Sequence, residues 1–150
     1  MAAIALLRLH HYTDDSAYRQ KAEQTLEAFA GVAEQFGIFA ATYGIAVIHL
    51  LESPMQVVVV ADSESDDNGS ALAAVAVKHF AFNKTVLRLT ANQAVAGNLP
   101  PALAATIPNL PQLHAGDAFA VVCSGASCQP PISRVVELQH ALDPSLKKKA

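Results

Sequence analysis

The sequence contains no tryptophan, and only 6% of its 150 residues are aromatic and 15% charged. Apolar residues make up 52% of the chain, most of them Ala, Val, Leu and Ile, which predicts an aliphatic core such as helices build on a valine-rich sheet. So little charge beside so much apolar material excludes an intrinsically disordered chain. The length fits about one domain.

An excess of basic residues is also absent, since 10 Lys and Arg stand against 13 Asp and Glu, for a net charge of −3. Proteins that bind nucleic acid or anionic membranes carry basic surfaces, so we expect neither as a partner. No uninterrupted apolar run reaches the ~18 residues of a spanning helix. The start lacks the basic region and cleavage site of a signal peptide, and two cysteines are too few for a disulfide framework, so we expect a cytoplasmic location.

The first third of the chain follows a helical period. After Asp14 and Asp15, which suit a helix N-terminus, apolar residues recur every three or four positions as far as Gly37. The spacing predicts helices over residues 2–11, 18–36 and 39–51, the last closed by Pro54. No capping residue precedes the first helix, so we expect the chain to begin inside an element. Residues 1–53 are therefore expected to form a helical segment of about three helices.

Residues 54–150 alternate between apolar runs of strand length and helices, which predicts a small α/β module. The strands are expected over 56–61, Lys84–Thr90 and 117–123, and the main helices over 70–80, capped by Ser70, and 132–142. The first run, QVVVVA, is apolar throughout, as in parallel strands buried on both faces. Four prolines divide the stretch before the last strand into short helical pieces around 93–95 and 102–106. The fold class is thus α/β, with a helical N-terminal part packed with a three-stranded, mainly parallel sheet.

Ligands bind at the carboxyl ends of strands in open parallel sheets, so the loops after the three strands are the first places to look for a site. The loop after the first strand offers Asp62, Ser63 and Glu64 as ligand-binding candidates, and Asp66 and Asp67 add further hard oxygen ligands. Capping and solvation of a helix start is the alternative reading of such a loop. The loop lacks a glycine-rich phosphate motif and regular metal-loop spacing, so we expect no cofactor and assign no metal ligands.

The loop after the third strand holds both cysteines, Cys123 and Cys128, separated by four residues and followed by Pro130 and Pro131. The pair could close into a disulfide and serve as a redox site, or it could be inert packing at a strand end. A zinc site would need a second pair of ligands.

Other catalytic patterns are weak. A dyad of either cysteine with His114 has no spacing that forces contact, His10 and His11 diverge on a helix, and Ser124 and Ser127 lack a hydrolase elbow. We assign no catalytic residue, and whether the chain is an enzyme stays open.

Segments that run in order across nearly the whole chain carry a family resemblance. They are residues 5–9, 13–14, 22–30, 56–60, 82–84 and the spaced pair Cys123 and Cys128 with Pro131. Together they resemble the C-terminal end of a family of large proteins that combine a thioredoxin-like domain with an α/α-toroid similar to N-acylglucosamine 2-epimerases. The family includes a spermatogenesis-associated thioredoxin-like protein. The chain departs from the family pattern at Ala61, where Gly is usual, and at Phe82, where Pro is usual.

The resemblance implies that residues 1–53 correspond to the last toroid helices, and that the family's thioredoxin-like domain and most of the toroid are absent here. It implies a non-catalytic structural or binding module, with a second copy or the missing domains as partner. Ile4, Leu7, Phe29, Phe36 and Ile45 are the expected contacts between copies. The alternatives are a redox-responsive or metal-binding module that uses Cys123 and Cys128, and part of a sugar-related enzyme in which the loop from Asp62 to Asp67 helps bind substrate.

Overall fold

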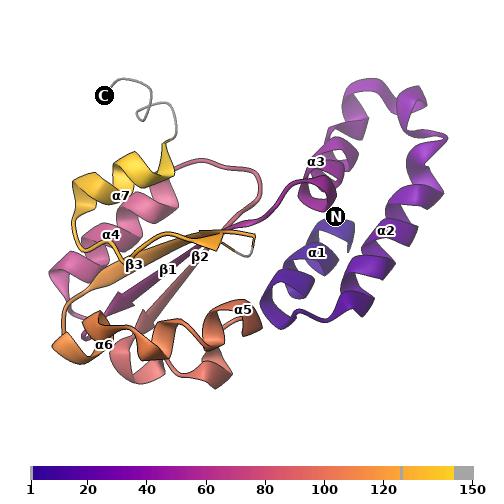
Figure 1. Ribbon diagram of the computed structural model, residues 1–150. Helices are drawn as coiled ribbons and strands as arrows, with labels where there is room; N and C mark the ends of the chain where they lie inside the picture. The colour runs from indigo at the N-terminus through magenta and orange to yellow at the C-terminus, as the bar shows by residue number, and fades with distance from the viewer. Residues whose placement is uncertain (1, 126, 144–150) are drawn as a thin grey trace. The chain divides into compact units, whose positions relative to one another are not determined.

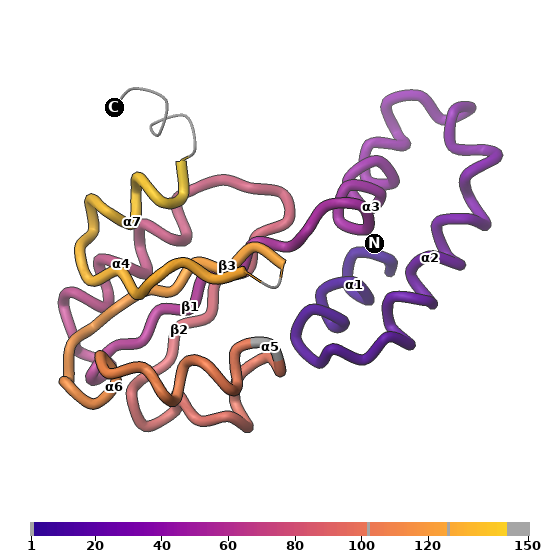
Figure 2. Tube along the Cα trace, in the orientation of Figure 1, coloured from indigo at the N-terminus to yellow at the C-terminus, as the bar shows by residue number. Residues whose placement is uncertain are grey.

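The computed structural model describes residues 2–125 and 127–143 of the chain. These residues form two compact units, divided between Pro54 and Met55 (Figures 1 and 2). The first unit is helical and the second combines helices with a four-stranded sheet, so the α/β class expected from the sequence is confirmed.

The helical unit contains α1 (Ala2–Thr13), α2 (Ser16–Ala30), the 3₁₀ segment η1 (Ala33–Ala40) and α3 (Ala41–Leu51). Its core is small and aliphatic, because one face of each α-helix supplies short side chains. The buried members are Ala3, Leu7, Ala22, Leu26 and Ala46. The Tyr43 hydroxyl donates to the Leu26 carbonyl oxygen at 3.3 Å and joins α3 to α2.

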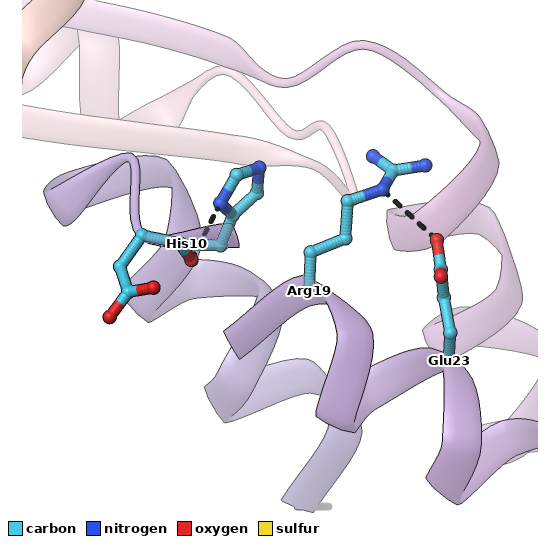
Figure 3. A network of polar contacts seen from close by, with 4 residues as sticks. His10, Arg19 and Glu23 are labelled. Carbon is cyan, nitrogen blue, oxygen red and sulfur yellow. Dashed lines mark hydrogen bonds and ion pairs between the residues drawn. The ribbon is translucent and has the colours of Figure 1, made fainter. Parts of the chain in front are cut away.

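Two adjacent aspartates turn the chain between α1 and α2. Asp14 takes a left-handed conformation, with φ of 58°, and its N–H donates to the His10 carbonyl. Asp15 then caps α2, because its carboxylate accepts the Ala17 N–H at 2.9 Å. His10 Nδ1 lies 3.1 Å from the Asp15 carbonyl oxygen, and Arg19 forms an ion pair with Glu23 one turn further along α2 (Figure 3).

The prediction of one helix over 18–36 is wrong at its end. α2 stops at Ala30, with Gly31 as its C-cap, and the 3₁₀ segment η1 follows instead of further α-helical turns. Glycine and β-branched residues such as Val32 have low helix propensity, so the apolar spacing alone does not extend α2 beyond Ala30. Gly37 takes a φ of 49°, which bends η1 before α3 begins.

The second unit is built on a mixed sheet of order β2-β1-β3-β4. Its strands are β1 (Met55–Ala61), β2 (Lys84–Thr90), β3 (Phe119–Ser124) and β4 (Ser127–Cys128). β1 and β2 are parallel, but β3 is antiparallel to β1, with Val60 opposite Phe119 and Gln56 opposite Cys123. The expectation of a mainly parallel, three-stranded sheet is therefore wrong in the direction of β3 and in missing β4.

Helices cover both faces of this sheet (Figure 1). On one face α4 (Asp67–Lys78) and α7 (Val135–Leu142) bury Leu72 and Leu138 against Val57 and Val59. On the other face lie five short helices, and they bury Leu103 and Ile107 against the strands. These helices are η2 (Ala91–Gln93), η3 (Ala96–Asn98), α5 (Pro101–Ala104), η4 (Ile107–Asn109) and α6 (Pro111–Ala115).

The short helices explain the direction of β3. A parallel strand needs a connection that carries the chain back along the whole strand, usually one long helix. Prolines at 100, 101, 108 and 111 break this connection into pieces that fold over the face, and it ends at Gly116 beside Asp62, at the edge where β2 also ends. β3 must then run in the opposite direction.

Candidate functional site

The acidic loop after β1 serves first as the start of α4. The helix begins at Asp67 and its cap is Asp66, whose carboxylate accepts the N–H groups of Asn68 at 2.9 Å and Gly69 at 3.1 Å and also that of Asp62 at 3.1 Å. The predicted cap at Ser70 is wrong, because Asp66 accepts these hydrogen bonds one turn earlier. The bonds from Gly69 and Asp62 hold the pKa of Asp66 below its usual range.

Three further contacts fix this loop. The Asn68 side chain donates to the Ser133 carbonyl at 3.1 Å, and Arg88 Nη2 donates to the Glu64 carbonyl at 3.0 Å and to Ser70 Oγ at 3.1 Å. Gly69 lies so close to β1 that a Cβ there would sit 2.5 Å from the Ala61 Cβ. The loop and the first turn of α4 are thus held in place by contacts with β1, with β2 and with the segment that precedes α7.

The predicted ligand residues Asp62, Ser63 and Glu64 are exposed on this loop. The Ser63 hydroxyl lies 3.3 Å from that of Ser65, and Glu64 contributes its backbone carbonyl to Arg88. Beside them is an open polar cleft of about 390 Å³, lined by Glu64, Arg88, Leu89, Thr90 and Gln93. The cleft could admit a small polar molecule, but its guanidinium and its Gln93 amide already bond to neighbouring backbone and side chains.

The two cysteines form a disulfide across the β3–β4 hairpin, with Cα atoms 4.0 Å apart. The Gln129 N–H donates to the Val122 carbonyl, which makes Cys123 and Cys128 a non-hydrogen-bonded cross-strand pair, the kind whose Cα atoms approach most closely. Their exposure differs sharply, because Cys123 is 1% exposed within the core and Cys128 lies in an exposed strand.

The acidic loop and the disulfide lie at opposite ends of the sheet. Cys123 pairs with Gln56, five residues along β1 from Ala61, a separation of about 17 Å at strand geometry. The sequence-based choice of these three loops assumed parallel strands, and it is wrong for the loop after β3, because β3 is antiparallel to β1. His114 lies in α6, which leads into the start of β3, so the structure does not bring it to the cysteines at the other end of that strand.

Across residues 2–125 and 127–143, no three His, Cys, Asp or Glu side chains gather closely enough to hold a metal ion.

Histidines in the helical unit interact in a way that the sequence did not indicate. The rings of His10 and His11 lie 5.8 Å apart, and His49 of α3 is buried. Burial lowers the pKa of His11, and the nearby charges of His10, His49 and Arg19 lower it further. Only the packing of α3 against α1 brings His49 into this group, which helical spacing within one segment cannot reveal.

An apolar groove of about 310 Å³ lies between α1, α2, η1 and α3 of the helical unit. No charged side chain is among the residues that line it, and several of the lining side chains are strongly exposed. Phe29 and Phe36 are 56% and 57% exposed, and Phe39, on the same segment as Ile38, is 87% exposed. We name Phe29, Val32, Phe36 and Phe39 the aromatic patch.

The expected contacts between copies differ in how exposed they are. Leu7 is fully buried within the helical unit and is not available to a partner, so its assignment to an interface is wrong. Phe29 and Phe36 are exposed, while Ile4 and Ile45 are partly buried.

One stretch of the described chain, Ala33–Leu51, is by length and composition apolar enough to cross a membrane. Its regular α-helical part is α3, of 11 residues, because Gly37 interrupts the 3₁₀ segment before it. A continuous spanning helix needs about 20 residues.

Comparison with known proteins identifies no relative, since no family model, curated protein or solved structure matches the chain.

Proposed function

We propose that the chain is a binding module without catalysis of its own, and that its helical unit binds a second copy of the same chain. The observation that carries the proposal is the aromatic patch beside an uncharged groove. Soluble proteins rarely leave such a surface open to water, and where they do it commonly marks an interaction site.

A second copy fits this surface because the surface is self-complementary. The groove has no charged lining, and Phe39, one of the residues that line it, is almost fully exposed. In a two-fold dimer the same patch meets itself, so the Phe39 ring of each copy can enter the groove of the other. Burying four apolar side chains per copy supplies the hydrophobic driving force, and no charge has to be desolvated.

The resemblance to the thioredoxin-like and toroid family offers an alternative occupant within this proposal. If the helical unit corresponds to terminal toroid helices, other domains of a longer chain would cover the patch. We propose a cytoplasmic location and neither nucleic acid nor membrane as partner, in keeping with the net charge of −3.

The test compares two substitutions by light scattering. Phe39→Asp places a charge in the middle of the proposed interface and is expected to convert a dimer into a monomer. Val136→Asp, at a residue that is 61% exposed on α7, is the matched control and should leave the dimer intact. If both variants and the unaltered protein are monomers, or if the unaltered protein instead binds lipid vesicles, the proposal fails.

A second role is favoured by a separate observation, the Cys123–Cys128 disulfide. We propose that the pair is redox-responsive, since a disulfide in a reducing compartment is usually transient or regulatory. Counting free thiols by alkylation in the cell, with and without oxidant, tests this role. A pair that stays fully reduced, or fully oxidised, under both conditions would contradict it.

The sugar-related alternative finds less support. It depended on the acidic loop, and Asp66 and Asn68 of that loop are engaged in fixing α4.

A further inference from the structure

The two sulfurs of the disulfide stand in unequal surroundings. Cys123 lies in the core beneath the short helices, in the cluster that includes Phe119 and Val121. Cys128 lies on the two-residue strand β4, and both residues of that strand are exposed. Gly125, with a φ of 57°, belongs to the turn that brings this exposed strand back beside β3.

Thiol–disulfide exchange requires a thiolate to reach one of the two sulfurs. Reaching the Cys123 sulfur means opening the packing around β3, whereas the Cys128 residue faces water. We propose that Cys128 is the entry site for a low-molecular-weight thiol and that Cys123 is the leaving group. The inference rests on the second role proposed above, and it specifies which sulfur the incoming thiol attacks and which sulfur leaves.

The incoming thiol is the reductant in this exchange. Its thiolate bonds to Cys128 Sγ, the bond between Cys128 Sγ and Cys123 Sγ breaks, and Cys123 leaves as a thiolate that takes a proton from solvent. A second thiolate then attacks the external sulfur of the mixed disulfide. Cys128 leaves as a thiolate, and the two external thiols depart as their own disulfide.

Backbone hydrogen bonds beyond the disulfide limit how far thiol–disulfide exchange can alter the fold. Beyond the hairpin tip, β3 stays bonded to the returning segment through the Gln129 N–H to the Val122 carbonyl at 2.9 Å. Ala120 and Ile132 exchange a further pair of backbone hydrogen bonds, each 2.8 Å. The mixed disulfide is therefore expected to mark the surface of a folded protein at Cys128 without unfolding its core.

The first experiment maps the adduct on the native full chain. The oxidised protein is treated with glutathione, quenched with acid, alkylated in denaturant and digested, and the peptides are read by mass spectrometry. We expect glutathione on Cys128 and the alkyl group on Cys123. Glutathione mainly on Cys123 would overturn the direction of exchange while leaving the redox role standing. Absence of any adduct or free thiol would overturn both.

The second experiment uses single-cysteine variants and does not depend on capturing an intermediate. The thiol of Cys123→Ser, which leaves Cys128, should react with an aromatic disulfide reagent at least about tenfold faster than the thiol of Cys128→Ser. Both variants should react at the same rate in denaturant, which controls for intrinsic reactivity. Equal rates in the native proteins would contradict the inference. Should either variant fail to fold, the adduct map decides alone.

Discussion

Gly69 shows how a single missing side chain fixes the acidic loop. A methyl group at this position would lie 2.5 Å from the Ala61 Cβ and 3.3 Å from the Ala61 Cα, so the strand backbone itself would have to move. Glycine here permits the start of α4 to approach the end of β1, at the cost of a weaker helix.

Substituting this glycine should therefore destabilise the protein although alanine is the better helix former. We expect Gly69→Ala to lower the free energy of unfolding by about 1–3 kcal/mol because of overpacking. Gly44→Ala is the matched control: Gly44 lies within α3 with nothing within 4 Å of its Cβ position, so alanine should stabilise by about 0.5–1 kcal/mol. Urea denaturation of both variants measures the difference. Two stabilised variants would disprove the close approach.

His11 gives the helical unit a dependence on pH. Because burial lowers the pKa of His11 below 6.5 in the folded state, the unfolded chain binds a proton that the folded chain does not as the pH falls through 6.5. The free energy of unfolding should be level above that pH and decrease on acidification to pH 5. The slope should be smaller in His11→Gln, measured by denaturation at a series of pH values. An equal slope in the two proteins would show that His11 is not the cause of the pH dependence.

For single residues, the sequence indicated the acidic loop as a candidate site but did not indicate the structural roles of its residues. Asp62, Ser63 and Glu64 stood out as ligand candidates, yet the side chains with structural contacts are Asp66 and Asn68. A hydrogen bond from Asn68 to Ser133 crosses 65 positions of chain, and no local pattern encodes it.

Among the elements, helix α4 is capped at both ends by side chains that lie outside it, Asp66 at the start and Lys84 at the end. At its C-terminal end the Lys84 amine, from the start of β2, donates to the carbonyls of Ala76, Val77 and His79. A cation suits this end of the helix dipole, although burial lowers the pKa of the amine. The position of Lys84 after the buried Asn83 thus has a structural purpose.

Removing this cap should weaken the α/β unit. We expect Lys84→Met to lower the free energy of unfolding by about 1 kcal/mol, since the methionine keeps the length of the side chain but leaves the carbonyls without their donor. Lys78→Met removes an exposed lysine from the last turn of the same helix and should change stability by less than about 0.5 kcal/mol. Thermal unfolding of the two variants checks the contrast, and equal losses would show that only net charge matters.

Element positions were largely predictable, but their directions and ends were not. The β2 boundaries follow from the sequence because an apolar run between turns defines them locally. The direction of β3 depends on how the proline-broken connection folds over a face, which is decided by packing with Leu103 and Ile107. The end of α2 at Ala30 depends on Gly31 within an otherwise continuous apolar period.

For the whole molecule, three buried clusters support the two units, one on each face of the sheet and one in the helical unit. The helical unit leaves much of its apolar surface unburied. The buried cluster of the helical unit has five residues, all alanine or leucine, and four of them lie on α1 and α2. The sequence singled out Phe29 and Phe36 as partner contacts from their place on an apolar face. It could not reveal Phe39 or the groove, because both arise where η1 joins α2 to α3.

The central claim is that the aromatic patch is buried by a second copy of the chain. The most direct measurement is sedimentation equilibrium of the unaltered protein across the micromolar range, since mass action makes dimerisation depend on concentration. The account predicts a mass that rises from 15.8 kDa toward twice that value as the concentration increases. A mass that stays at 15.8 kDa throughout would contradict it.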